Sequence, residues 1–175
     1  MDNREQNNCA VSCCFTGHRP EHLPWGRDEG SQDYSDFYLR LSHATETMIQ
    51  RGCRIFYCGM AQGVDIMAAQ IVLGFREARP EWGLKLIAVC PHAGQAARWS
   101  AKDRQMYQFL LHHADETVVL AQAYTPACFH QRNRYMVDRS GYVIAGFDGI
   151  TKGGTASTVH YAKRVGRQIL VVPPA

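Results

Sequence analysis

Hydrophobic positions along this chain form two kinds of run. Six short runs rich in Val, Ile, Phe, Tyr or Cys have the length of buried β-strands, at residues 10–15, 54–58, 84–90, 116–120, 142–145 and 168–172. These runs are continuous rather than alternating, which is typical of parallel strands that are covered on both faces. The segments between them carry apolar residues at helical spacing, so strands and helices alternate along the chain.

Five helices are predicted between the strands. The expected helical segments are 37–49, 64–75, 98–113, 131–140 and 156–165. Gly52 and Gly166 end the first and the last of them, and the second stops before Pro80. Five repeats of strand and helix, closed by a strand, predict one doubly wound α/β domain with a mostly parallel sheet and helices on both faces. We expect the strand order 3-2-1-4-5, with the sixth strand at the C-terminus.

Composition agrees with a single ordinary domain. The chain has 175 residues, of which 46% are hydrophobic and 20% charged, which excludes a coiled coil and a mainly disordered chain. Residues 1–9 are polar and are predicted to form a disordered tail, leaving 10–175 as the domain. With no signal-peptide pattern and no apolar run of membrane length, we expect a cytoplasmic protein without membrane contact. The seven cysteines are an odd number and are interpreted as reduced thiols of the core.

Charge is unevenly distributed along the chain. The net charge is only +3, yet residues 130–175 hold 7 Lys and Arg against 2 Asp and Glu. Such a basic segment suits a small anionic ligand such as a phosphate or a nucleotide, or a modest nucleic-acid surface. Solvated side chains on helix faces are the plainer alternative.

Three strand ends are followed by glycine-bearing turns, which is where doubly wound sheets bind ligands. Glycines let the backbone approach a ligand closely, and a helix N-terminus favours an anion. The helix before the fifth strand adds two arginines and an amide suited to phosphate, ribose or base. The predicted ligand-binding residues are Gly17, His18, Arg19, Gly59, Gly63, Asp65, Arg132, Asn133, Arg134, Gly153, Gly154 and Thr155.

Each of these positions also has a purely structural interpretation. The first turn can be a turn with two solvated polar residues, and Asp65 can bind a ribose hydroxyl or only favour its helix N-terminus. Because parallel strands end at the same edge of the sheet, three such turns together predict one nucleotide or sugar-phosphate cleft.

Cysteine and aromatic residues near the same edge allow other kinds of chemistry. Cys13 and Cys14 are adjacent, so in a strand they point to opposite faces, and no metal site is predicted. Cys58 or Cys90 beside a histidine could form a nucleophilic pair, although buried inert thiols are the simpler interpretation. The aromatic residues Trp25, Trp99, Tyr124 and Phe129 either stack on a base or pack the helices.

The motifs in these turns resemble those of the YpsA-like proteins, within the SMF/DprA–LOG (SLOG) superfamily of Rossmann-like nucleotide-binding domains. The resemblance covers about residues 10–172. It is carried by Gly17-His18-Arg19-Pro20, Leu23-Pro24-Trp25-Gly26, Gly59-Met60-Ala61-Gln62-Gly63-Val64-Asp65, Arg132-Asn133-Arg134-Tyr135-Met136-Val137-Asp138 and Gly153-Gly154-Thr155, with Pro91, Trp99 and Tyr161-Ala162-Lys163.

The resemblance implies a Rossmann-like domain that binds a nucleotide-derived ligand as a sensor or binding module. The turn 59–65 is similar to the S-G-x-A-x-G-[IV]-D loop of the DprA branch, with Cys58 in place of serine. The turn 153–155 is similar to the LOG phosphate loop P-G-G-x-G-T-x-x-E. There Thr158 stands in place of the glutamate on which LOG hydrolases depend, so this turn supports ligand binding more than the LOG hydrolase activity.

Two further functions are kept as alternatives. A nucleotide-processing hydrolase would cleave an N-glycosidic or phosphoester bond, with Asp65, Asp148 or His18 as acid or base. Binding of single-stranded nucleic acid, as in the DprA branch, would use the basic segment 130–175. No cofactor or catalytic residue is assigned, and a homo-oligomer is left open.

Overall fold

The structure, a computed structural model, describes residues 9–150 and 152–175. The tail expected at residues 1–9 therefore lies outside the described residues, apart from Cys9. Cys9 itself is buried, its carbonyl accepts a hydrogen bond from Gly141 N (2.7 Å), and its Sγ lies 3.3 Å from Nη1 of Arg167. The folded part thus includes Cys9, one residue earlier than the predicted boundary, because two distant segments contact it.

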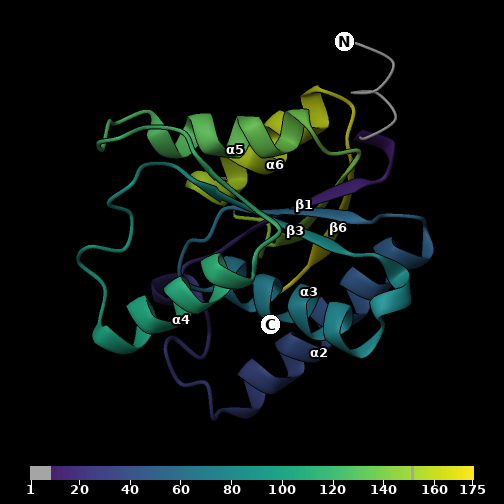
Figure 1. Cartoon of the computed structure of the whole chain (residues 1–175). Coiled ribbons are helices and arrows are strands. Elements are labelled where there is room, and N and C mark those ends of the chain that lie inside the picture. Colours follow the sequence, from purple (N-terminus) through teal and green to yellow (C-terminus); the bar gives the residue numbers. More distant parts are fainter. Residues whose placement is uncertain (1–8, 151) are drawn as a thin grey trace.

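A single sheet of six parallel strands forms the centre of the described chain (Figure 1). The strands are β1 (Ser12–Gly17), β2 (Ile55–Cys58), β3 (Lys85–Cys90), β4 (Glu116–Val119), β5 (Tyr142–Gly146) and β6 (Gln168–Val172). Their order is β4-β3-β2-β1-β5-β6. In the register of the central strands, Cys14 pairs with Tyr57 of β2 on one side and Val143 of β5 on the other.

Helices cover both faces of the sheet, as Figure 1 shows. One layer contains α2 (Gln32–Gln50), α3 (Val64–Ala78) and α4 (Ala101–His113), and the other contains α5 (Cys128–Asp138) and α6 (Gly154–Arg164). Short 3-10 turns at Pro20–His22 (η1) and Pro80–Trp82 (η2) precede α2 and β3. The α/β class, the parallel sheet and the two helical layers are confirmed.

Two apolar cores follow from the alternation of side chains along the strands. Phe15 of β1 faces the α2–α3–α4 layer and stacks on Phe56 with ring centroids 5.9 Å apart. Cys14, the residue before it, faces the α5–α6 layer and packs with Val143 and Met136. Burial of both faces explains why the strand sequences are continuously apolar.

One strand lies elsewhere than expected. We predicted β4 beside β1, but it forms the edge of the sheet next to β3. Its residues Glu116, Thr117 and Val119 are exposed, whereas β1 is buried along almost its whole length. A strand between β1 and β5 would be covered on both faces, so this polar strand is suited to the edge. Because β4 lies at the edge, β5 pairs directly with β1.

Helix boundaries follow local capping signals. The hydroxyl of Ser31 accepts a hydrogen bond from Tyr34 N, and Ser100 caps α4 in the same way through Asp103 N. After α2 and α6, Gly52 (φ 98°) and Gly166 (φ 73°) adopt the left-handed conformation that ends helices. Within the described ranges, none of the helices combines the length and the apolar character needed to cross a membrane.

Candidate functional site

The carboxyl edge of the sheet brings the three predicted turns together. β1 lies between β2 and β5, and the chain order reverses across the β1–β5 pair, which makes that pair the topological switch point. Gly17 and Gly146 are paired there, and His18 N donates to Gly146 O (3.2 Å). The turns after β1, β2 and β5 are therefore neighbours, as the sequence predicted, although the expected order of strands was different.

The first two turns pack directly on each other. A Cβ added to Gly17 would overlap the side chain of Val64, and one added to Gly63 (φ 90°) would lie 2.5 Å from His18 O. The first amide of α3, Val64 N, donates to His18 O at 3.2 Å. These glycines thus allow the start of α3 to contact the end of β1, and the contact leaves no room for a ligand between them.

A buried ion pair fills the second turn. Nη1 of Arg132 lies 3.1 Å from Oδ2 of Asp65, and each side chain is less than one tenth exposed. The same oxygen accepts a hydrogen bond from Ala61 N (3.2 Å), and a Cβ on Gly59 would overlap the guanidinium group. Burial raises the pKa of the Asp65 carboxyl, and the positive charge of Arg132 opposes that effect. Asp65 and Arg132, expected at ribose or base, are bound to each other here.

A histidine and a carboxylate meet at the switch point. Nε2 of the buried His18 lies 3.0 Å from Oδ1 of Asp148. The amide of Ile150 donates to the same carboxyl (3.0 Å). This amide, with His18 adding to its effect, lowers the pKa of Asp148. Of the three predicted acid–base candidates, His18 and Asp148 are in contact.

An aromatic and cationic cluster lies beside these turns. The guanidinium carbon of Arg19 is 5.1 Å from the centroid of the Phe129 ring, and that of Arg132 is 5.9 Å from it. The rings of His92 and Tyr124 each lie 6.3 Å from the same ring. The sequence pointed to Tyr124 and Phe129 only as aromatic residues near strand ends. The cluster itself depends on segments that only the fold brings together.

The third turn is open, in contrast to the first two. Gly153 has φ 100°, and no atom of the described residues, apart from chain neighbours and the backbone of the helix itself, lies within 4 Å of a Cβ added to Gly153 or Gly154. The first bond of α6 runs from Ser157 N to Gly153 O (3.0 Å), so the amides of residues 154–156 have no acceptor within the helix. Thr151, in the same turn, lies outside the described residues.

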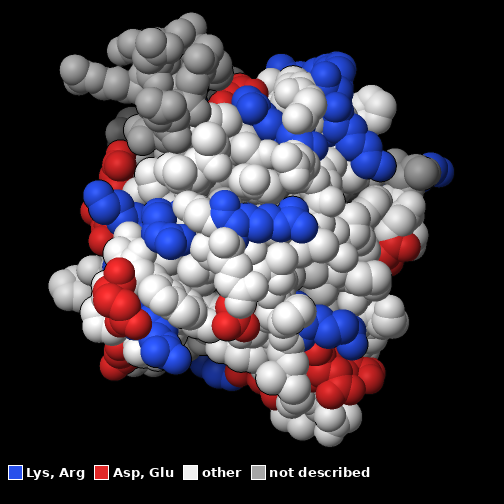
Figure 2. Space-filling view, turned by 90° about the vertical axis from the view of Figure 1, so that its right-hand side faces the viewer, with Lys and Arg blue, Asp and Glu red and all other residues white. Residues whose placement is uncertain are grey.

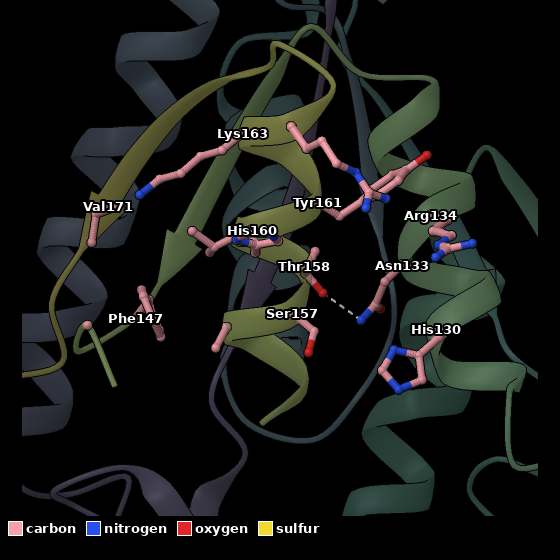
Figure 3. A pocket seen from close by; sticks show the side chains of 14 residues that line it. His130, Asn133, Arg134, Phe147, Ser157, Thr158, His160, Tyr161, Lys163 and Val171 are labelled. Carbon is pink, nitrogen blue, oxygen red and sulfur yellow. Dashed lines mark hydrogen bonds between the residues drawn. The ribbon is translucent and has the colours of Figure 1, made fainter. Parts of the chain in front are cut away.

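A pocket of about 760 Å³ extends from this turn along α6, and we call it the α5–α6 pocket (Figure 3). Its basic lining residues are His130 and Arg134 of α5 and His160, Lys163 and Arg164 of α6, and none of the described residues that line it is Asp or Glu. Figure 2, which shows the right-hand side of the molecule in Figure 1, has Lys and Arg side chains gathered in its upper part, at the level of α5 and α6.

Among the described residues, the two arginines of the α5–α6 pocket contact an aromatic ring and have no carboxylate partner. The guanidinium groups of Arg134 and Arg164 each lie 5.2 Å from the ring of Tyr161, whose hydroxyl binds Asp138 (2.6 Å). The amide of Asn133 donates to Thr158 Oγ1 (2.7 Å), shown by the dashed line in Figure 3. Thr158, where LOG hydrolases have glutamate, therefore links the two helices by hydrogen bonding.

The structure divides the predicted residues into two groups. Asn133 and Arg134 line the α5–α6 pocket, and residues 153–155 begin the helix that forms its wall. The residues Gly17, His18, Gly59, Gly63, Asp65 and Arg132 instead form the packed floor of the carboxyl edge, with Arg19 exposed above it. Sequence reasoning missed His160 and Arg164 as lining residues. Their spacing from Ser157 on one helix is the signal that could have identified them.

The thiols at this edge do not have the character of nucleophiles. Burial raises the pKa of Cys58 and of Cys90 above the ordinary value. Cys58 Sγ donates to Asp65 O (3.0 Å), and Cys90 Sγ lies 3.1 Å from the Tyr107 hydroxyl. Both thiols are therefore protonated at neutral pH, which favours the inert interpretation over a Cys–His pair.

Comparisons with known proteins agree with this architecture. The family model YpsA, described as the YspA SLOG family, matches residues 13–169. A relative, the uncharacterized SPbeta prophage-derived protein YoqJ of Bacillus subtilis, is 30% identical over 133 residues, which are 68% of this chain and 76% of the relative.

Two solved structures of DNA processing protein A share the fold. The Helicobacter pylori structure matches with a TM-score of 0.61 and 16% identity, over 97% of this chain and 68% of that one. The Streptococcus pneumoniae structure matches with a TM-score of 0.57 and 17% identity, over 91% of this chain. This chain spans about half (49%) of the length of the S. pneumoniae protein.

Proposed function

The chain belongs to the YspA SLOG family, and on that premise we propose that it binds a nucleotide or nucleotide-derived ligand at the carboxyl edge, as a binding or sensing module. The observation that carries this proposal is the α5–α6 pocket, in which five basic side chains face no carboxylate among the described lining residues. Unpaired guanidinium and ammonium groups gathered in a hollow raise the local concentration of anions. A phosphate group is the anion that best matches planar arginine side chains.

The start of α6 supports the same ligand. Its first three amides lack acceptors in the helix, and Gly153 and Gly154 leave the space in front of them open. Amides at a helix N-terminus bind phosphate because their dipoles add to a partial positive charge. We propose that a phosphate contacts Gly154 and Thr155 here, with Asn133 and Arg134 beside it.

The Phe129 cluster suits the remainder of a nucleotide. Phe129 directly precedes His130, the first pocket-lining residue of α5, so the ring and one wall of the pocket belong to the same helix. A planar base can stack on an aromatic ring or on a guanidinium group, and Arg19 and Phe129 offer both. In this proposal the packed residues around Asp65 and His18 hold these groups in position.

Titration with defined nucleotides tests the proposal. We expect at least one of AMP, ADP, ADP-ribose and NAD to bind the purified chain by isothermal titration calorimetry. Replacing Arg134→Ala removes a charge-assisted phosphate contact and is expected to weaken that ligand about tenfold or more. The matched control is Arg139→Ala, since Arg139 lies on the surface at the end of the same helix and also stacks on a ring, that of Tyr135, away from the pocket.

Two results would overturn the proposal. One is the absence of binding for every nucleotide in the panel. The other is equal affinity of Arg134→Ala and Arg139→Ala, which would mean that the pocket does not contribute.

Single-stranded nucleic acid is a second candidate ligand. The Helicobacter pylori neighbour is described as binding single-stranded DNA. In this chain, the guanidinium groups of Arg134 and Arg164 both lie 5.2 Å from the ring of Tyr161, and a group of cationic and aromatic side chains is typical of surfaces that bind a single strand.

Salt dependence separates this second candidate from a mononucleotide site. Binding of an oligothymidylate should weaken steeply with salt, and Arg134→Ala should lower the slope of log Kd against log salt by about one. No measurable binding at low salt would exclude it.

A further inference from the structure

A second hollow lies on the opposite face of the sheet, in the α2–α3–α4 layer. It has a volume of about 820 Å³, and we call it the α3–α4 groove. Its walls come from the segment 20–34, from residues 62–70 at the start of α3, and from residues 98–109 along α4. Volumes of this order are typical of small-molecule sites. In Figure 1 the helices of this groove lie on the other side of the sheet from α5 and α6.

Aromatic side chains from two of these segments line the α3–α4 groove. They are Trp25 and Tyr34 of the segment 20–34, and Trp99 and Phe109 of the segment 98–109. Trp25 meets Tyr34 edge-on, with ring centroids 6.0 Å apart and planes at 89°, and packs on Phe37 at 5.0 Å. Trp99 packs edge-on against Tyr107 at 5.2 Å and 75°. Both indole rings are therefore held in fixed orientations by neighbours, which lowers the entropy cost of binding a ring between them.

Most charges of the α3–α4 groove are paired with one another. Oδ2 of Asp103 accepts hydrogen bonds from Arg27 Nη1 (3.0 Å) and Gln62 Nε2 (2.7 Å). Lys102 Nζ lies 2.9 Å from a carboxylate oxygen of Glu29. A charged ligand would have to compete with these partners, unlike in the α5–α6 pocket, where no carboxylate among the described residues lines the wall.

An amide supplies a polar contact inside the apolar wall. Gln70 Nε2 lies 3.5 Å from the sulfur of Met106, and a thioether is a weak acceptor. This amide therefore has hydrogen-bonding capacity to offer a ligand. Met67 and Met106, also in the wall, have flexible side chains that adapt to the shape of an apolar group.

We propose that the α3–α4 groove is a second binding site, which takes an uncharged, planar aromatic molecule held by Trp25 and Trp99 and oriented by the amide of Gln70. The site is independent of the proposed nucleotide ligand, because the two hollows lie on opposite faces of the sheet and share none of the residues that line them.

The uncharged fluorescent probe N-phenyl-1-naphthylamine tests this site. We expect saturable binding to one site per chain, seen as a rise in probe fluorescence on leaving water. Trp99→Ala should weaken binding about tenfold or more, because it removes one aromatic wall. The matched control is Trp82→Ala: Trp82 is also half-buried and packs on Phe75 at 5.9 Å, but it lies outside the groove.

The charge preference is tested with 8-anilinonaphthalene-1-sulfonate, which keeps the ring system and adds a sulfonate. We expect this probe to bind about tenfold more weakly, because Arg27 and Lys102 already have the carboxylate partners Asp103 and Glu29. Arg98, the third cation of the lining, is exposed to solvent and would have to be desolvated to bind the sulfonate. Equal affinity of the two probes would overturn the preference for an uncharged ligand.

Folding of the variants is checked by circular dichroism before binding is compared. If Trp99→Ala does not fold, Phe109→Ser replaces it, since Phe109 lines the groove with 52% of its surface exposed. A loss of binding in either groove variant, with Trp82→Ala unchanged, supports the site. Equal binding by the groove and control variants, or the absence of saturable binding, would overturn the second site. Either result would leave the proposal of a nucleotide ligand untouched, because that proposal is tested by its own titration.

Discussion

The first two glycine turns and the third turn look alike in sequence but differ in what occupies them. At Gly17, Gly59 and Gly63 the space of a side chain is taken by Val64, Arg132 and the backbone of His18. At Gly153 and Gly154 no atom of another described segment occupies that space, and the helix that follows forms one wall of a basic pocket. The first two turns are closed by the protein itself, and the third is available to a ligand.

A glycine before a helix therefore has two distinct physical uses. In a closed turn the missing Cβ allows two protein segments to touch, so the residue serves packing. In an open turn it exposes backbone amides, so the residue can serve binding. Replacing these glycines by alanine distinguishes the two uses, because an added Cβ overlaps another segment only in a closed turn.

Substitution Gly59→Ala should have the largest effect on stability. The new Cβ would displace the guanidinium of Arg132 from Asp65, which disturbs a buried ion pair and overpacks the turn. We expect the free energy of unfolding to fall by about 3 kcal/mol, measured by urea denaturation.

Gly74→Ala is the matched control for this substitution. Gly74 lies inside α3 with no atom within 4 Å of an added Cβ, so alanine there should stabilise the chain by about 0.5–1 kcal/mol. Similar stabilities for the two variants would show that the second turn is not closed.

The pair Gly63→Ala and Gly153→Ala compares a closed and an open turn at similar φ. Both glycines have positive φ (90° and 100°), so both alanines carry the strain of a side chain in that region. Only Gly63→Ala also overlaps another atom, the carbonyl oxygen of His18. Its loss of unfolding free energy should therefore exceed that of Gly153→Ala by about 1–3 kcal/mol. A reversed order would contradict the distinction.

A smaller effect is expected from Asp148→Asn at the start of the third turn. The amide of Ile150 and the side chain of His18 lower the pKa of Asp148. The ionised carboxylate therefore stabilises the folded chain at pH values above the ordinary pKa of about 3.8, and this stabilisation is lost as the pH falls through the lowered pKa. The variant should melt at a lower temperature than the wild type at about pH 7, and the difference should shrink at about pH 3. A difference that does not change with pH would rule out an electrostatic origin.

Most of the fold could be predicted from the pattern of apolar residues. Continuous apolar runs and helical stripes identified six parallel strands and two helical layers, because the side-chain periods of strands and helices are local properties. The position of β4 could not be predicted in the same way, since strand order depends on which helices share a face. Its exposed Glu116 and Thr117 were the signal for an edge strand.

The candidate site could be predicted only in part. Glycines at strand ends and the basic segment indicated the carboxyl edge, and Asn133 and Arg134 do line a pocket there. The pairing of Asp65 with Arg132 joins residues 67 positions apart, and the Phe129 cluster joins four segments. Contacts of this kind follow from the packing of helices on the sheet, and they do not produce a periodic pattern of residues from which they could be predicted.

The sequence by itself determined the kinds of element, the parallel sheet and the edge where its glycine turns meet, because these depend on local periodicity and on strand direction. The packing of the helices decided that α3 and Arg132 fill two of these turns, and that two indole rings line a second groove. It also decided that the third turn, as far as the chain is described, is not filled, and that no carboxylate of a described residue lines the pocket beside α6. The physical reason is that filling a space depends on the distances between segments, which the chain acquires only when its helices pack.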